Sequence, residues 1–237
     1  MKKIIALNLK MNLGYKEILD YIKTIQNKVT DNYEVIFFPT SIYLDLFKKS
    51  GYLVGAQNVH FENKGAYTGE ISPYQLKSLG VDYTLVGHSE RRLHFKENDI
   101  LINEKVKGAL KNQLKVILCV GETDEERLSN KTYSVIENQL KNNLQNIDLE
   151  DVTIAYEPVW AIGSGKTPTK DEIDEVVSFI KKKVKQENAI DIRVLYGGSV
   201  NKENIKDIMS IESVDGVLVG SSSIDPNYLI SMIDIID

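Results

Sequence analysis

Short apolar segments rich in β-branched residues recur along the chain, and a stretch of helical length follows each of them. Eight segments are predicted as strands, at residues 4–9, 33–38, 53–57, 83–86, 115–120, 152–156, 192–196 and 216–219. Between them, apolar residues are spaced for one face of a helix, as at Ile18, Ile22, Ile25 and Val29, or at Ile173, Val176, Val177 and Ile180. Strands that alternate with helices in this way are typical of a parallel sheet covered on both faces.

The number of repeats narrows the fold class. Eight strand–helix units favour a closed (β/α)8 barrel, the TIM-barrel architecture, over an open sheet. Because no Pro-, Gly- or Ser-rich linker and no shift of composition divides the chain, we expect an α/β fold with one domain across residues 1–237, a parallel eight-stranded closed sheet inside a ring of helices. A polar loop at residues 61–72 is too long for a tight strand-to-helix turn, and long loops usually carry function.

Composition and charge exclude several classes of protein. The chain is 42% hydrophobic and 27% charged, as in ordinary globular proteins, and its net charge is −5 with no basic block, which argues against a nucleic-acid surface. The apolar run at the N-terminus stops at Asn8, short of a signal peptide, and no apolar stretch approaches the ~18 residues of a membrane span. A lone cysteine, Cys119, cannot form an intramolecular disulfide, so we expect a cytoplasmic protein.

The strand exits are where the chemistry of such a barrel is expected, because active sites lie at the C-terminal ends of the strands. Glu157 ends the sixth predicted strand, and Pro158 restricts it to extended geometry, so a carboxylate is held at the rim as a candidate base. Taken alone, a glutamate at a strand end is more often a surface or salt-bridged residue.

Two further strand exits carry candidate groups. His88 precedes Ser89 and Glu90, which are predicted as the cap and first turn of a helix; the positive end of a helix disfavours imidazolium, so we expect a neutral imidazole. A hydrogen-bonded structural histidine explains the residue equally well. Lys10 could stabilise charge that develops on a substrate oxygen, although most lysines only solvate a surface.

Glycine-rich turns follow the seventh and eighth strands, at residues 197–199 and 220–222, in the units that frequently bind phosphate in barrels. Glycine lets backbone N–H groups approach phosphate oxygens closely. Residues 161–167 resemble the end of a nucleotide-binding P-loop but lack the required four-residue gap between glycines, so we reject that interpretation and predict a small hinged lid. The residues alone therefore indicate a barrel for a small phosphorylated metabolite.

The segment at residues 155–167, AYEPVWAIGSGKT, resembles the triosephosphate isomerase family, and the resemblance extends along nearly the whole chain. Supporting segments lie at residues 8–12, 55–58, 65–70, 86–92, 119–122 and 196–200. The resemblance implies interconversion of dihydroxyacetone phosphate and glyceraldehyde 3-phosphate without cofactor or metal. It further implies that Glu157 moves a proton between two carbons, that neutral His88 exchanges protons with their oxygens, and that Lys10 and Asn8 stabilise the oxyanion.

The same resemblance assigns the phosphate site and a partner. Backbone N–H groups would hold the phosphate, those of Gly163, Ser199, Gly220 and Ser221. The loop at residues 65–71 resembles the family's interdigitating loop, whose tip, here Thr68, enters a neighbouring subunit, so a homodimer is expected. The alternative is a long surface loop on a monomer.

Three positions depart from the usual family pattern. Leu9 replaces an aromatic residue, which we interpret as a packing change directed away from the site. Ser221 replaces a second glycine, and because serine is small we expect phosphate binding to be retained. Pro168 replaces an alanine whose N–H meets the Tyr196 hydroxyl when the lid closes; proline has no N–H, so we predict that closure relies on Ser199 and the backbone of Gly165 instead.

Other functions fit the chain less well. A Schiff-base aldolase would need an inward-facing lysine on a strand, and no predicted strand interior offers a convincing one. A metal-dependent isomerase would need clustered ligands, but His60, His88 and His94 show no ligand spacing. A non-catalytic phosphate-binding barrel with a scaffolding role remains the alternative, and it is disfavoured because all four catalytic candidates are present.

Overall fold

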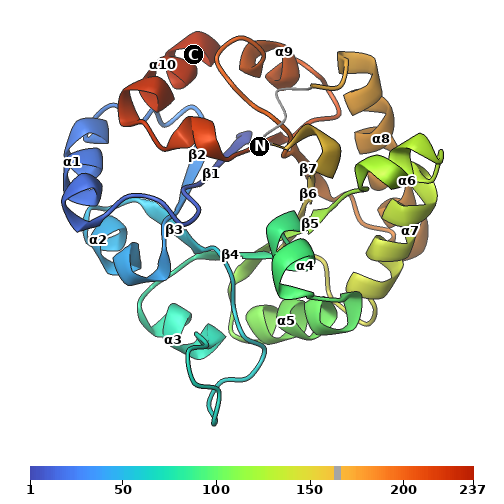
Figure 1. Cartoon of the computed structure of the whole chain (residues 1–237), viewed down its shortest axis with the longest axis horizontal. Coiled ribbons are helices and arrows are strands. Elements are labelled where there is room, and N and C mark those ends of the chain that lie inside the picture. Colours follow the sequence, from blue (N-terminus) through green and yellow to red (C-terminus); the bar gives the residue numbers. More distant parts are fainter. Residues whose placement is uncertain (163–166) are drawn as a thin grey trace.

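The structure is a computed structural model that describes residues 1–162 and 167–237. In this part of the chain, eight parallel strands pair in chain order, and β1 pairs with both β2 and β8, which closes the barrel (Figure 1). The strands are β1 (Ile4–Asn8), β2 (Glu34–Phe38), β3 (Leu53–Ala56), β4 (Tyr83–Val86), β5 (Lys115–Val120), β6 (Val152–Tyr156), β7 (Arg193–Tyr196) and β8 (Gly216–Val219). The predicted fold class is confirmed.

The predicted strands match the observed ones closely, and four of them have the predicted bounds. The other four differ by one residue at one end. The first strand ends at Asn8 rather than Leu9, because the chain turns at Lys10, which has a left-handed φ of 51°. The third ends at Ala56 because the Gln57 side chain turns back to donate to the carbonyls of Lys10 and Phe38.

Helices surround the barrel as an outer ring (Figure 1). They are α1 (Tyr15–Ile25), α2 (Leu44–Lys49), α3 (Pro73–Ser78), α4 (Ser89–Phe95), α5 (Asp99–Lys111), α6 (Asp124–Leu128), α7 (Thr132–Asn143), α8 (Lys170–Asn188), α9 (Ile205–Met209) and α10 (Pro226–Ile236), with short 3-10 turns η1 (Ser41–Tyr43), η2 (Val159–Ala161) and η3 (Ser221–Ser223). The predicted apolar face of α8 is buried. In α1 the helix ends before Val29, which packs against the core from the following turn. No helix in the described ranges is long and apolar enough to cross a membrane.

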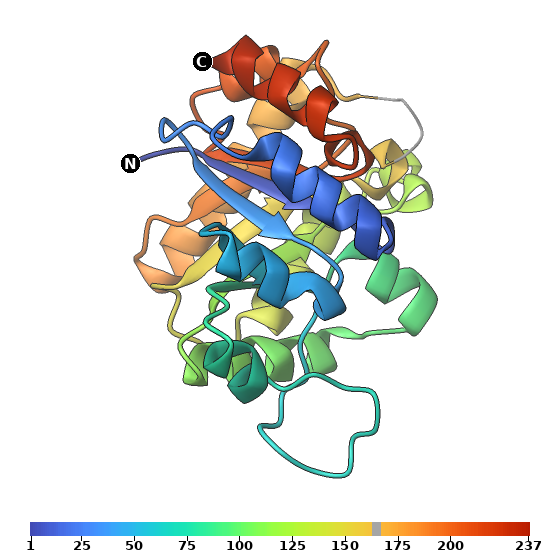
Figure 2. The same cartoon turned by 90° about the vertical axis from the view of Figure 1, so that its left-hand side faces the viewer.

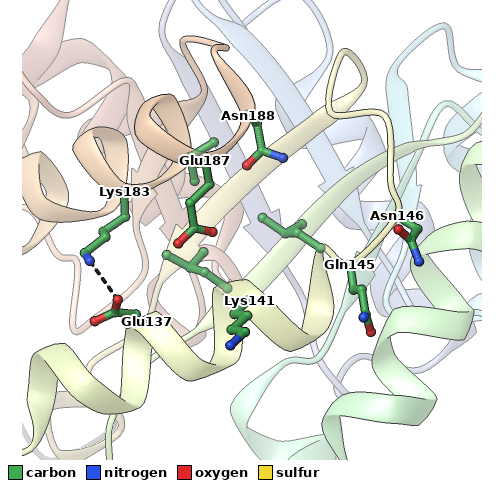
Figure 3. Close-up of a pocket in the computed structure, with 10 residues that line it drawn as sticks. Glu137, Lys141, Gln145, Asn146, Lys183, Glu187 and Asn188 are labelled. Carbon is green, nitrogen blue, oxygen red and sulfur yellow. Dashed lines mark hydrogen bonds and ion pairs between the residues drawn. The ribbon is translucent and has the colours of Figure 1, made fainter.

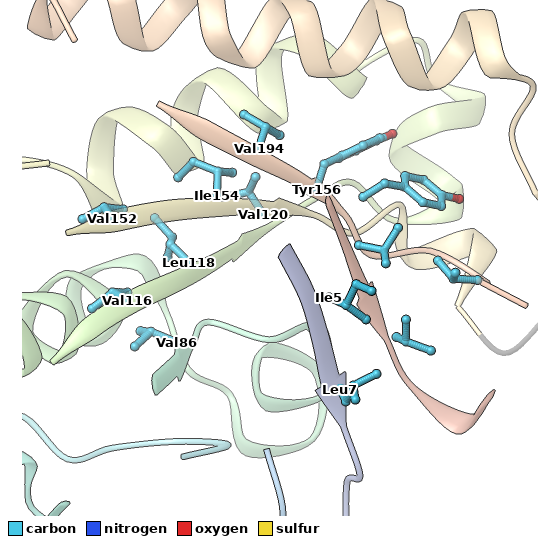
Figure 4. Close-up of a cluster of buried hydrophobic side chains, with 14 of the residues drawn as sticks. Ile5, Leu7, Val86, Val116, Leu118, Val120, Val152, Ile154, Tyr156 and Val194 are labelled. Atoms are coloured by element: carbon cyan, nitrogen blue, oxygen red, sulfur yellow. The ribbon is translucent and has the colours of Figure 1, made fainter. Parts of the chain in front are cut away.

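Two buried layers hold the barrel together, since alternate residues of a strand face opposite sides. One layer fills the barrel interior: Ile4, Ala6, Ile36, Phe38, Tyr83, Leu85, Ile117, Cys119, Ala155, Leu195 and Leu218. The other lies between the strands and the helices and includes Ile5, Val116, Leu118 and Ile154 (Figure 4). Leu9 belongs to this outer layer and is fully buried, which confirms that its side chain is directed away from the barrel interior.

The loop at residues 61–72 projects from one end of the molecule between β3 and α3 (Figure 2). Its return into α3 is fixed by a capping box, in which Ser72 accepts from the Gln75 N–H and the Gln75 side chain accepts from the Ser72 N–H. Thr68 is exposed on this loop. A projecting loop with a well-anchored base is suited to contact another molecule.

Candidate active site

A cavity of ≈ 230 Å³ lies at the C-terminal ends of the strands and brings together most of the residues that the sequence singles out. Its described lining residues are Asn8, Lys10, His88, Glu157, Ile162, Gly197, Gly198, Ser199, Val200, Asn201, Leu218, Gly220, Ser221 and Ser222. A second cavity, of ≈ 460 Å³, shares three of these residues, Asn8, Lys10 and His88. The catalytic candidates therefore lie where the two cavities meet.

Glu157 and His88 are in direct contact inside this site. Glu157 Oε1 lies 3.2 Å from His88 Nε2, and both side chains are buried, 3% and 6% exposed. The second carboxylate oxygen accepts the N–H of Ser89 at 3.3 Å. The backbone behind Glu157 is closely packed, because a Cβ on Gly121 would lie 1.9 Å from the Glu157 carbonyl oxygen. The site thus holds the carboxylate at a defined place.

Each member of this pair shifts the pKa of the other. Burial acts to raise the pKa of Glu157, but the His88 imidazole, the Ser89 N–H and the Cys119 thiol stabilise the carboxylate and lower the pKa overall. Burial is the largest single influence on His88 and acts to lower its pKa, but the Glu157 and Glu90 carboxylates together outweigh it and raise that pKa. The low proton affinity expected for His88 from a helix terminus is therefore not found in this arrangement, because Glu157 is in contact with the ring.

His88 itself, and not Ser89, caps α4. Its Nδ1 accepts the N–H of Glu90 at 3.3 Å, and the first helical residue is Ser89, so the sequence-based cap was placed one residue too late. An N–H that points at Nδ1 requires a lone pair there, so the geometry assigns the ring proton to Nε2, facing Glu157. Nδ1 therefore accepts a hydrogen bond from the helix, and Nε2 donates one toward Glu157.

Lys10 is held in an unusual conformation beside this pair. Its φ is 51°, its N–H donates to Asn8 Oδ1 at 3.0 Å, and its carbonyl accepts from Gln57 Nε2 at 2.8 Å. The ammonium forms an ion pair with Glu90 at 2.5 Å. Sequence reasoning assigned no role to Glu90 or Gln57, although both lie in segments that resemble the family.

The described candidate phosphate residues line the same cavity as the catalytic candidates. Ser199, Gly220 and Ser221 are all among its lining residues, whereas Gly163 lies outside the described residues. In the described part of the chain, the N–H groups of Ser199 and Ser221 have no backbone or side-chain acceptor. Gly220 lies beside the lysine, since a Cβ there would come within 3.2 Å of Lys10 Cε. These N–H groups remain available for an anionic ligand.

Gly163 and Gly165, which bracket the predicted lid, lie outside the described residues, as does the predicted contact between Ser199 and Gly165. The Ser199 hydroxyl donates instead to the Ala161 carbonyl at 2.5 Å. The Tyr196 hydroxyl is buried and has no hydrogen-bond partner among the described residues. Pro168, which could offer it no N–H, is buried in the segment that leads into α8.

A third cavity, of ≈ 190 Å³, lies between the C-terminal halves of α7 and α8 (Figure 3). Its rim carries an ion pair of 2.7 Å between Lys183 and Glu137. None of the described residues that line it is a site residue indicated by the sequence. Across the described ranges, no group of three His, Cys, Asp or Glu side chains is arranged to hold a metal ion.

Comparison with known proteins agrees with this geometry. The family model described as triosephosphate isomerase matches residues 3–236. A triosephosphate isomerase of Thermodesulfovibrio yellowstonii is 46% identical over 95% of this chain and 96% of its own length. One of Clostridium botulinum is 46% identical over 93% and 94%, and one of Endomicrobium trichonymphae is 44% identical over 94% of each chain. The chain belongs to the triosephosphate isomerase family.

Proposed function

We propose that this chain interconverts dihydroxyacetone phosphate and D-glyceraldehyde 3-phosphate. The observation that carries the proposal is the buried contact between Glu157 and His88, in a cavity that also reaches the N–H groups of Ser199 and Ser221. A carboxylate base, an imidazole and an ammonium that line one cavity together with anion-binding N–H groups fit a three-carbon substrate that ends in a phosphate.

In the proposed reaction, Glu157 takes a proton from the hydroxymethyl carbon beside the substrate carbonyl. The electron pair of the broken C–H bond forms a carbon–carbon double bond, and the carbonyl oxygen becomes an oxyanion. Lys10 and Asn8 stabilise that oxyanion, and His88 moves a proton from one oxygen to the other through Nε2. Glu157 then returns its proton to the second carbon, so the product is an isomer and no atom or electron is exchanged with a cofactor.

The resting contact has a consequence for the base. The His88 ring and the Ser89 N–H stabilise the Glu157 carboxylate, so in this position Glu157 is a weakened base. Substrate must take over the His88 Nε2–H, and Glu157 must turn toward the substrate carbon. Burial then acts on a carboxylate that has lost these stabilising contacts, which raises its pKa and strengthens the base when it is needed.

The phosphate group is proposed to bind the N–H groups of Gly163, Ser199, Gly220 and Ser221. The two glycine-rich turns after β7 and β8 support this, because they face the same cavity as the base. Lys10 adds a positive charge nearby in a chain of net charge −5.

The experiment follows conversion of glyceraldehyde 3-phosphate through a coupled hydride-transfer assay, with Glu157→Gln as the control. Rapid turnover that the substitution abolishes is the expected result. A folded native protein without turnover would instead support the non-catalytic phosphate-binding alternative.

We also infer that the chain forms a homodimer through the loop at residues 61–72. Exposed apolar side chains support this: Met11 is 91% exposed and Phe95 64% exposed, and both line the cavity of ≈ 460 Å³ beside Lys10 and His88. Exposed apolar groups around an open cavity are typical of a surface that another chain covers. A cytoplasmic location is proposed on the single cysteine, which is buried.

A further inference from the structure

Strands β4 and β5 separate just beyond the pair Val86 and Leu118, where their ladder ends. The guanidinium of Arg92, from the last turn of α4, lies across this separation. Its Nε donates to the Gly87 carbonyl at 2.8 Å, and its Nη2 donates to the Cys119 carbonyl at 3.3 Å. One side chain therefore joins the two strand exits at the place where the next backbone rung would be.

Each of these carbonyls is connected closely to one member of the reacting pair. Gly87 directly precedes His88 and has a φ of 72°, and a Cβ on it would lie 3.2 Å from Arg92 Nη2 and 3.3 Å from the Cys119 carbonyl oxygen. Cys119 is buried, and the carbonyl of the following residue, Val120, accepts the Glu157 N–H at 2.7 Å. The backbone on both sides of the guanidinium thus leads to His88 on one side and to a contact of Glu157 on the other.

We propose that Arg92 is a positioning residue for catalysis, which fixes the distance between His88 and Glu157 by joining the Gly87 and Cys119 carbonyls. The inference rests on the roles proposed above for His88 and Glu157. It assigns no contact between Arg92 and substrate.

The chemistry requires arginine. The remaining nitrogen, Nη1, donates to Asp99 Oδ1 at 2.7 Å, so three nitrogens of one planar group serve three acceptors in fixed directions. Lysine has a single nitrogen on a flexible stem and cannot hold these acceptors at fixed mutual distances. The ion pair with Asp99 lies on the far side of the guanidinium from the two carbonyls, so it can be altered separately.

The test compares Arg92→Lys with Asp99→Asn. Arg92→Lys keeps the charge but loses the fork, and we expect kcat to fall about 10-fold or more, as for a small misplacement of reacting groups. KM and inhibition by inorganic phosphate should change by less than about 2-fold, because the described phosphate residues lie in the turns after β7 and β8, away from β4 and β5. Asp99→Asn retains an acceptor for Nη1 and both carbonyl contacts, so its kcat should stay within about 2-fold of the native value.

The pH profile separates positioning from simple stabilisation. If Arg92 keeps Glu157 in contact with the His88 ring and the Ser89 N–H, its replacement weakens contacts that lower the pKa of Glu157. The pKa on the acid side of the kcat/KM profile should then be higher in Arg92→Lys than in the native enzyme. A residue that only stabilises the fold would lower the melting temperature and leave both kcat and this pKa unchanged below it. Unchanged kcat in folded Arg92→Lys, or a loss confined to KM, would overturn the inference.

Two further measurements separate a failure of folding, or of the proposed catalytic roles, from a failure of the inference about Arg92. If Arg92→Lys does not fold, Arg92→Ala is assayed with and without ethylguanidinium; recovery of kcat supports the inference, and its absence in folded protein overturns it. Glu157→Gln and His88→Asn are assayed in parallel. A folded native protein without turnover would refute the proposed function, and full activity in these two variants would refute the roles proposed for Glu157 and His88. Their inactivity together with a fully active Arg92→Lys would refute only the role of Arg92.

Discussion

At the scale of single residues, the site depends on the contact between two buried side chains, Glu157 and His88. Glu157 and His88 are both almost inaccessible to water, so neither can be solvated when it carries charge. Their contact resolves this, since each lowers the cost of the charged form of the other. A change in one group must therefore appear as a pKa shift of its partner.

Replacement of Glu157 by Gln should lower the pKa of His88. The amide removes the Glu157 charge that raises this pKa, so burial of the ring and the Lys10 ammonium lower it against the Glu90 carboxylate alone. NMR titration of ring-labelled histidine in both proteins measures the shift, with exposed His94 as an internal reference. An unchanged or raised pKa in Glu157→Gln would contradict the assignment.

The raised pKa of His88 also predicts the direction in which the free energy of unfolding changes with pH. Because the folded pKa of His88 is raised above the ordinary value near 6.5, its contribution to the free energy of unfolding is fully present below that value and is lost as pH rises through the folded pKa. Urea unfolding across this window should show a smaller pH dependence in Glu157→Gln than in the native protein.

Tyr196→Phe should have a small effect on turnover and on stability. The hydroxyl is buried without a partner among the described residues, and Pro168 has no N–H to offer it, so its removal leaves no described group unpaired. We expect kcat/KM within about 3-fold of the native value, a change of less than ~0.7 kcal/mol.

Tyr156→Phe is the matched control, because the Tyr156 hydroxyl lies 3.2 Å from both oxygens of the buried Glu122 carboxylate. Its loss should destabilise the protein by about 1.5–3 kcal/mol, as for a hydrogen bond to a charged group. A large loss of turnover in Tyr196→Phe, with Tyr156→Phe unaffected, would show that the Tyr196 hydroxyl acquires a partner during catalysis.

At the scale of elements, the interiors of strands and long helices could be predicted from the sequence, because their buried apolar residues recur at regular spacing. The C-terminal ends of β1 and β3 could not, because they depend on contacts of Lys10 and Gln57. The short elements α2, α6 and α9 have five or six residues, too few to show a period.

The candidate site, too, could be predicted in part from the sequence. Its residue types and their order at the strand exits could be predicted, since barrels place chemistry there. The contacts of Glu90 with Lys10, and of Arg92 with two backbone carbonyls, could not, because they join segments whose spacing along the chain carries no signal.

Gly121→Ala should disrupt the exit of β6. The added Cβ would lie 1.9 Å from the Glu157 carbonyl oxygen, so the backbone of the base must move. We expect kcat to fall by 10-fold or more, on the order of the loss from a 1 Å misplacement. Gly14→Ala is the control, since a Cβ there meets only a side-chain oxygen of Glu17 at 3.4 Å, and its activity should stay near the native value. Equal activities would contradict the close packing inferred at Gly121.

At the scale of the whole molecule, the barrel closes through β1 and β8, so its two ends fold against each other. We therefore propose one domain, as the continuous strand–helix repeat indicates, and expect a single cooperative unfolding transition. The loop at residues 61–72 is the one long projection among the described segments (Figure 2), and the apolar surface near the active site is the other feature that a lone barrel does not explain.

Phe95→Glu should weaken the proposed homodimer. Phe95 is 64% exposed and lines the cavity shared with Lys10 and His88, so a charge there would be buried in the interface at a cost. Leu128→Glu is the control, because Leu128 is 78% exposed on α6 and is absent from the described lining of that cavity. Sedimentation velocity at micromolar concentration should show monomers for the first variant and dimers for the second.

Dilution then tests whether the partner completes the site. Lys10 lines a cavity of ≈ 460 Å³ that is open in the single chain, and its side chain is 19% exposed, so water reaches an ammonium that acts best when water is excluded. If a second chain covers this cavity, activity per protomer in Phe95→Glu should fall as the protein is diluted and recover as it is concentrated, whereas Leu128→Glu should show constant specific activity. Activity that stays constant while the protein dissociates would mean that each barrel carries a complete site, and that the exposed apolar surface serves assembly alone.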